Sequence, residues 1–98
     1  MWTLSEDRMR IRREFVTKNF VTAMDFLNAA AVIAEDQGHH PDLHVTGYRN
    51  VAVELYTHSV GGLTENDFIV AAELDNVKVA YSPKWLTEHP AAAGTEKQ

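Results

Sequence analysis

The spacing of apolar side chains changes twice along this chain, and this limits the folds that the chain can adopt. Residues 9–17 alternate between apolar and polar side chains, as a half-buried strand does. Residues 19–37 carry apolar side chains at three- and four-residue steps, which predicts a helix between an N-cap at Asn19 and a stop at Gly38. Alternation returns over residues 49–58, so a helix separates two strands.

Shorter segments add further elements. Residues 2–4 and 43–45 predict two more strands, and apolar spacing predicts a second helix over residues 64–81. Asp67 stands near the start of this helix, where a carboxylate completes a capping box, and we assign it mainly that role. One misfit is Arg13, which falls on the apolar side of its strand. Together these elements predict an α+β fold in which helices pack on one face of a four-stranded antiparallel sheet.

The chain is short enough to form a single domain. With 98 residues it lies near the lower end of the sizes at which one core suffices, and partner subunits often add buried area to such chains. We expect residues 1–82 to form the domain and residues 83–98 to be a partly flexible C-terminal tail, because the chain end is rich in small and polar residues. An oligomer is therefore expected.

Composition excludes several classes of function. The formal net charge of -5 disfavours binding to the phosphate backbone of nucleic acids, although basic residues gather over residues 8–18. The absence of cysteine excludes disulfides, a thiolate nucleophile and cysteine-ligated zinc. No apolar run reaches the length of a membrane span. We expect a cytoplasmic protein, with an organelle left open, that has no membrane and no direct nucleic-acid partner.

Histidines concentrate in two short segments that the predicted fold can bring together. His39 and His40 follow the stop at Gly38, and His58 stands at the end of the last strand, on its mixed rather than its apolar face. Paired imidazoles can donate one proton and accept another near neutral pH, which suits acid/base catalysis. Glu35, four residues before His39, could orient an imidazole through its carboxylate.

Two other interpretations of the histidines remain open on the residues alone. Three imidazoles can bind a metal ion, although adjacent histidines rarely point at one ion and the pattern supplies no fixed fourth ligand. Alternatively, His39 and His40 are a solvated loop pair and His58 is unrelated to them, because two adjacent histidines are a weak signal.

A longer set of motifs is far more specific than the histidine pair. Its members are Ala34-Glu35, His39-His40-Pro41-Asp42, Tyr48, the alternating Val51, Val53 and Leu55, Thr57-His58, and Gly61-Gly62-Leu63-Thr64-Glu65-Asn66-Asp67-Phe68. In this order they resemble the pterin-4a-carbinolamine dehydratases, and the likeness covers about residues 9–80.

The resemblance implies a fold and a reaction. It implies a four-stranded antiparallel sheet with helices, a homodimer or homotetramer, and neither a metal nor an organic cofactor. The implied reaction removes water from 4a-hydroxytetrahydrobiopterin, the pterin substrate, to give quinonoid dihydrobiopterin. This step recycles the cofactor of the aromatic amino-acid hydroxylases, which is the implied pathway link.

Family positions carry over residue by residue. His39 and His58 are the implied acid/base groups, while His40 holds the pterin and shares in proton transfer. Glu35 supports the site, and the resemblance implies a wall made of Pro41, Asp42, Thr57, Ser59 and Val60.

The chain departs from the family pattern at three places. Gly38 stands where many relatives carry Asp or Asn, and the spacing from His40 to His58 is one residue longer than in the animal form, with the extra residue near Gly47. The family's N-terminal helix has no counterpart ahead of Trp2. Alternatives to the enzyme are a non-enzymatic dimerisation partner or transcriptional coactivator, as in animal relatives that bind a homeodomain factor, and a helper in molybdopterin cofactor metabolism.

Overall fold

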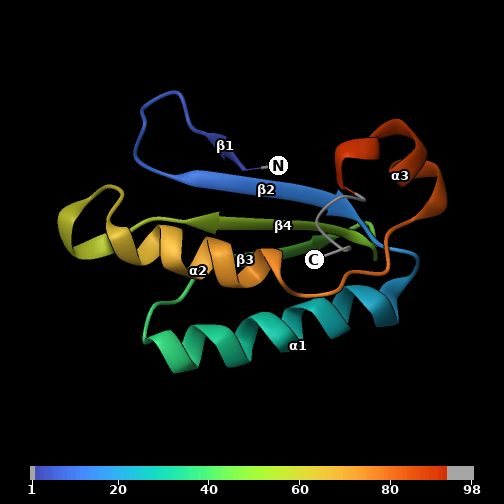
Figure 1. The fold of residues 1–98 in the computed structure, drawn as a ribbon, viewed down its shortest axis with the longest axis horizontal. Helices are drawn as coiled ribbons and strands as arrows, with labels where there is room; N and C mark the ends of the chain where they lie inside the picture. The colour runs from blue at the N-terminus through green and yellow to red at the C-terminus, as the bar shows by residue number, and fades with distance from the viewer. Residues whose placement is uncertain (1, 93–98) are drawn as a thin grey trace.

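The computed structural model describes residues 2–92 and shows one antiparallel sheet with two helices packed against one face (Figure 1). The strands lie in the order β1-β2-β4-β3, which confirms the predicted α+β class with four strands. In chain order the elements are β1 (Thr3–Leu4), β2 (Ile11–Val16), α1 (Phe20–Gln37), β3 (Asp42–Thr46), β4 (Asn50–Leu55), the 3-10 turn η1 (His58–Val60), α2 (Glu65–Asp75), α3 (Pro83–Glu88) and the 3-10 turn η2 (Pro90–Ala92).

The core lies between the sheet and the two longer helices. Alternate residues of β2 and β4 point toward α1 and α2, as the period of two requires, and Phe15 and Val53 are buried there. Phe15 meets Phe26 of α1 edge to face, with ring centroids 4.9 Å apart. Leu74 of α2 is also fully buried in this cluster, so both helices share one core with the sheet. No helix within residues 2–92 is long and apolar enough to cross a membrane.

Helix α1 begins and ends where the sequence predicts. The Asn19 side chain accepts a hydrogen bond from the backbone N–H of Thr22, which satisfies one of the free donors of the first turn. Gly38 ends the helix in the left-handed region at φ 63°, and its N–H bonds back to the carbonyls of Ala34 and Glu35. The chain therefore leaves α1 in a direction that this cap sets.

Two elements end earlier than predicted. Helix α2 ends at Asp75 rather than near Tyr81, because the residues that follow return to β2. The backbone N–H of Lys18 donates to the carbonyl of Ala80, and the backbone N–H of Ser82 donates to the carbonyl of Val16, both at 2.9 Å. Val79 and Tyr81, beyond Asp75, are still buried, but from extended chain.

The last strand is also shorter than predicted. Strand β4 ends at Leu55 rather than at His58. Thr57 instead forms a bridge with Gly62, and Gly61 at φ 63° closes the turn between them. The short η1 turn therefore carries His58 beyond the end of β4 rather than inside a strand.

Arg13 does not interrupt the apolar face of β2. Its side chain is 2% exposed, with the guanidinium over the Phe15 ring at 4.8 Å. One nitrogen donates to the Tyr81 hydroxyl at 2.8 Å, and another lies 3.3 Å from a carboxylate oxygen of Asp75. The predicted misfit is thus a buried cation that joins β2 to the end of α2.

The segment after Tyr81 forms α3 and η2 within the described residues. The Trp85 ring is stacked between those of Tyr81 and His89, at centroid distances of 5.2 Å and 4.3 Å, and Ala92 is fully buried. Residues 93–98 lie outside the part of the chain that the structure describes, so the predicted tail over residues 83–98 stays a prediction.

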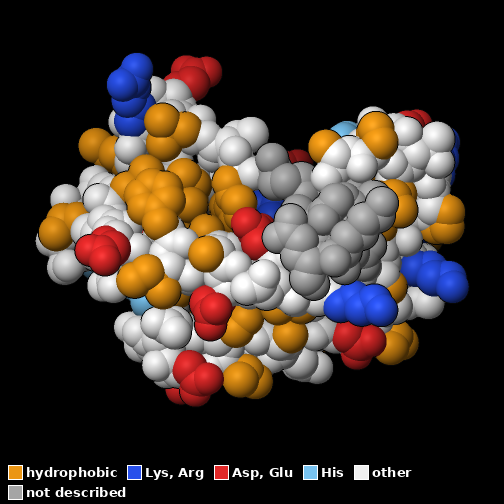
Figure 2. Space-filling view, viewed as in Figure 1, with side chains coloured by type: hydrophobic (Ala, Val, Ile, Leu, Met, Phe, Trp, Pro, Cys, Tyr) orange, Lys and Arg blue, Asp and Glu red, His pale blue; other side chains and the backbone are white. Residues whose placement is uncertain are grey.

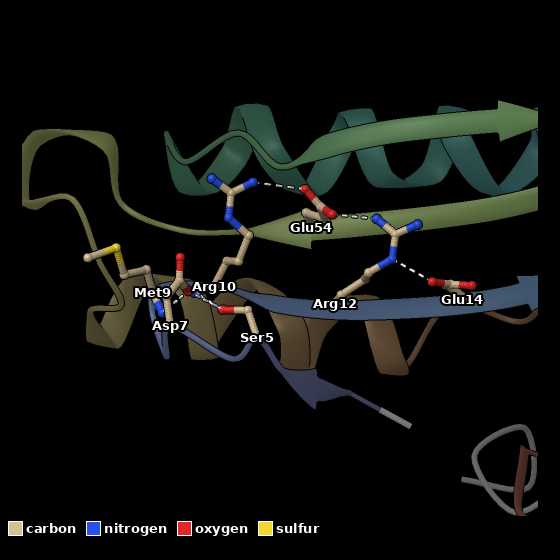
Figure 3. A network of polar contacts seen from close by, with 7 residues as sticks. All are labelled: Ser5, Asp7, Met9, Arg10, Arg12, Glu14 and Glu54. Carbon is tan, nitrogen blue, oxygen red and sulfur yellow. Dashed lines mark hydrogen bonds and ion pairs between the residues drawn. The ribbon is translucent and has the colours of Figure 1, made fainter.

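The opposite face of the sheet carries a charged network, shown in Figure 3. Glu54 of β4 lies 3.1 Å from the Arg10 guanidinium and also bonds Arg12, which in turn lies 2.5 Å from Glu14. Burial alone would raise the pKa of Glu54, but hydrogen bonds from Arg12 and Arg10 outweigh it and hold the pKa below its ordinary value of 4.5. The network therefore favours the ionised carboxylate.

This network predicts a pH-dependent contribution to stability. Because the pKa of Glu54 is lower in the folded chain, its contribution is complete above the unfolded pKa and is lost as pH falls through the folded pKa. We expect Glu54→Gln to lower the free energy of unfolding by about 1 kcal/mol at pH 7 and by less at pH 3. Urea unfolding of both proteins at the two pH values measures this, and a difference that grows on acidification would contradict it.

Arg13 and Asp75 predict an asymmetric pair of mutants. Asp75→Ala leaves a buried guanidinium without its carboxylate and is expected to cost about 3 kcal/mol. Arg13→Met is expected to cost clearly less, because the side chain of Asp75 is 35% exposed and can be hydrated. Denaturant unfolding compares the two, and an equal or larger loss for Arg13→Met would show that the charge pair does not dominate.

Candidate active site

The end of α1 presents two histidines in succession. The backbone N–H of His39 donates to the carbonyl of Ala34 at 3.1 Å, which continues the cap formed by Gly38. Nε2 of His40 lies 2.5 Å from a carboxylate oxygen of Glu35, and both side chains are exposed. Glu35 thus contacts the second imidazole of the pair.

His39 is directed instead toward the start of α2. Its Nε2 lies 2.6 Å from Oδ1 of Asp67, whose side chain is fully buried while that of His39 is 13% exposed. A carboxylate can only accept hydrogen bonds, so the imidazole donates through Nε2–H. This fixes the ring by one nitrogen and leaves Nδ1 as the nitrogen that can meet a substrate.

The second oxygen of Asp67 is bonded from two other elements. Oδ2 accepts from the hydroxyl of Thr57, two residues beyond β4, and from the backbone N–H of Thr64, each at 2.9 Å. The Thr57 and Thr64 hydroxyls lie 2.6 Å apart, and Thr64 donates because the one Thr57 proton is used on Asp67. One buried carboxylate therefore joins the ends of α1 and β4 to the start of α2.

His58 follows Thr57 directly and opens η1. Its side chain is exposed, and its ring meets that of Tyr56 at a centroid distance of 6.1 Å and an angle of 64°. Ser59 and Val60 are exposed on the same turn. His58 is thus tied to the Asp67 cluster through the backbone of Thr57, whereas its ring makes a separate contact.

The remaining residues of the predicted wall lie beside the histidine pair. Pro41 is half-buried, and Asp42 opens β3 with an exposed side chain. In the register of the sheet Asp42 stands opposite Glu54. These two residues lead the chain from the histidines back into the sheet.

Other features of the described surface lack this concentration of proton-transfer groups. Among residues 2–92, no three histidine or carboxylate side chains are grouped so that they could hold a metal ion. A hollow of about 460 Å³ between β1 and α2 is apolar and contains no histidine, and Figure 2 shows hydrophobic side chains gathered there. The histidine segments are therefore the candidate site.

Asp67 is the residue that sequence reasoning placed only in part. Its assignment as a helix cap is correct, since it accepts from the backbone N–H of Thr64. Its bond to His39 spans 28 residues of chain, which local spacing does not encode. The available signal was that the Thr-x-x-Asp cap closely follows Thr57-His58, so that both lie near one end of the sheet.

Comparison with known proteins gives the family. The family model described as pterin 4 alpha carbinolamine dehydratase matches residues 1–77. The chain belongs to this family, as its motif order indicates.

Individual relatives agree with this assignment. The chain is 46% identical over 80 residues to pterin-4-alpha-carbinolamine dehydratase 2, mitochondrial, of Arabidopsis thaliana, covering 80% of this chain and 43% of the plant protein. It is 49% identical over 78 residues to a Legionella pneumophila (strain Corby) protein of the same family name, covering 80% and 68%. The chain thus spans less than half of the plant relative and about two thirds of the bacterial one.

A solved structure shares the fold. The transcriptional coactivator/pterin dehydratase from Brucella melitensis superposes with a TM-score of 0.70 at 39% identity, over 76% of this chain and 78% of that one. The agreement supports the sheet order and helix placement described above.

The Asp67 cluster predicts a site-specific loss of stability. Asp67→Asn keeps the shape but turns an amide N–H toward at least one of the three donors, so about 2 kcal/mol of unfolding free energy should be lost. Glu65→Gln, an exposed carboxylate in the same helical turn, is the matched control and should change stability by less than about 0.5 kcal/mol. Chemical denaturation measures both, and similar losses in the two variants would contradict the prediction.

Proposed function

We propose that this protein is a hydro-lyase that dehydrates 4a-hydroxytetrahydrobiopterin, the pterin-4a-carbinolamine, to quinonoid dihydrobiopterin. Membership of the family and the names of the relatives support the substrate class. The observation that carries the proposal is the bond between His39 and the buried carboxylate of Asp67, because it leaves one imidazole nitrogen free on a fixed ring.

The reaction needs two proton transfers. One proton must reach the departing 4a-hydroxyl, and one must leave the adjacent ring nitrogen. The lone pair left on that nitrogen then forms the C=N bond as the C–O bond breaks, and water is the leaving group. An acid and a base that titrate near neutral pH meet both needs, and imidazole serves as either.

The proposed roles follow the placement of each histidine. His39 and His58 exchange protons with the pterin, while His40 holds the pterin and shares in proton transfer. The contact between Glu35 and His40 supports this second role, since a carboxylate partner limits rotation of an exposed ring. Pro41, Asp42, Thr57, Ser59 and Val60 would form the wall.

The proposal extends to pathway and assembly. The product would return to aromatic amino-acid hydroxylases as recycled cofactor, without a metal or organic cofactor in the dehydration itself. We also propose a homodimer or homotetramer. Strand β3 supports this because it is an edge of the described sheet, and unpaired edges invite pairing with another copy.

A non-enzymatic role as a coactivator is the second candidate. The Brucella melitensis neighbour is named for both roles. Phe20, Val21 and Val32 are exposed on α1 and would suit a protein partner. Partner capture that survives loss of all three site histidines, together with absent dehydration, would favour this candidate over the enzyme.

Histidine substitutions test the enzymatic proposal. We expect His39→Ala and His58→Ala each to slow decay of a freshly generated 4a-carbinolamine by about 100- to 10,000-fold relative to wild type. His44→Ala is the matched control, because His44 is exposed on β3 outside the candidate site, and it should retain full activity. Stopped-flow absorbance follows the decay. Wild-type activity in a His39→Ala/His58→Ala double variant would overturn the assignment.

A further inference from the structure

The three candidate histidines differ in what holds their rings. His39 and His40 each bond a carboxylate through Nε2. The His58 ring has no hydrogen-bond partner among the residues that the structure describes, and its contact is the Tyr56 ring. An exposed imidazole without such a contact samples several rotamers, whereas proton transfer needs one orientation.

Tyr56 is itself held by a cation. The guanidinium carbon of Arg10 lies 4.6 Å from the centre of the Tyr56 ring, within cation–π range. The aromatic ring of Tyr56 thus has Arg10 against its face and His58 beside it at 64°. Edge-to-face geometry of this kind is a preferred arrangement of aromatic rings.

The sheet register explains why these side chains meet. Ile11 stands opposite Leu55 in the antiparallel pair of β2 and β4, so the next step outward places Arg10 beside Tyr56. Both side chains lie on the face that carries Glu54, because successive residues of a strand alternate between faces. The position of Arg10 beside Tyr56 is therefore set by the backbone register rather than by one side-chain rotamer.

Arg10 is fixed in turn by its carboxylate neighbour. Glu54 bonds Arg10 at 3.1 Å and also bonds Arg12, and Figure 3 shows both guanidinium groups reaching the same carboxylate. The Glu54 side chain is 17% exposed, against 39% for Arg10 and 37% for Arg12, so the carboxylate is the more buried partner of each pair. A chain of contacts thus runs from Glu54 through Arg10 and Tyr56 to His58.

We propose that Tyr56 is a positioning residue for His58, and that Arg10 stacked on its ring holds it in place. Tyr56 does not touch substrate in this assignment; it limits the orientations of the imidazole so that a ring nitrogen faces the site. The catalytic consequence rests on the proposed function, whereas the orientation of the ring does not.

Kinetics of matched variants test the consequence. Tyr56→Ala should lower kcat for carbinolamine dehydration by about tenfold with little change in KM, since misplacing a proton-transfer group by about 1 Å costs up to about 100-fold. Tyr56→Phe keeps the ring and should restore kcat to the wild-type value. Arg10→Gln should lower kcat by several-fold, on the order of half the Tyr56→Ala effect on a logarithmic scale.

The chain supplies a control for Arg10. Arg49 is also stacked on a tyrosine, with its guanidinium 5.4 Å from the Tyr48 ring, but it lies at the opposite end of β4 from His58. Arg49→Gln removes a comparable pair and should leave kcat unchanged. Equal losses in Arg10→Gln and Arg49→Gln would indicate a general effect on the sheet and would overturn the inference.

An NMR measurement tests the orientation without any substrate. The ring current of Tyr56 should displace the imidazole proton resonances of His58, and the displacement should vanish in Tyr56→Ala and persist in Tyr56→Phe. Unchanged His58 resonances in Tyr56→Ala would overturn the inference even if the enzyme is active. Absent dehydration by wild type would overturn the proposed function, and the NMR result would still decide whether Tyr56 orients His58.

Discussion

The buried carboxylate of Asp67 is the interaction on which the candidate site depends. It accepts three hydrogen bonds, from the His39 ring, the Thr57 hydroxyl and the backbone of Thr64, which belong to three separate parts of the chain. A fully buried carboxylate is costly unless such donors satisfy it. Removing one donor therefore raises the free-energy cost of keeping the Asp67 carboxylate buried against the other two. Packing of this corner and placement of the imidazole therefore depend on the same hydrogen bonds.

That coupling explains why the end of α1 matters to the chemistry. The chain turns out of the helix toward Asp67 at Gly38, whose φ of 63° has no steric cost for glycine. His39 then bonds the buried carboxylate of Asp67, and His40 bonds the exposed carboxylate of Glu35. The two adjacent imidazoles thus contact one buried and one exposed carboxylate.

Local pattern accounts for much of the fold and for less of the site. The α1 caps and the inward faces of β2 and β4 follow from spacing alone, because each depends on residues a few positions apart. The end of α2 does not follow from spacing, since the apolar residues after Asp75 suit a helix equally well. Backbone hydrogen bonds to β2 and the residues after it hold them in extended chain instead. The same limit applies to Asp67 and to Arg13, whose partners lie 28 and 68 residues away in the chain. Pairings over such distances depend on topology that a single sequence does not specify.

The three imidazoles are also unequal in their free nitrogens, and this bears on the proposed reaction. His39 has Nε2 committed to Asp67, so any proton it takes from a pterin must enter and leave through Nδ1. His58 is exposed with both nitrogens open among the described residues, so it can accept a proton at one nitrogen and release another to water from the other. A ring that exchanges protons with solvent, as His58 can, suits the step after which the protonation state must be restored before the next turnover. A ring fixed on a buried carboxylate suits the step in which geometry decides the rate. Holding His58 by an aromatic ring rather than by a carboxylate keeps both nitrogens available while still limiting rotation, which a hydrogen bond to either nitrogen would not allow.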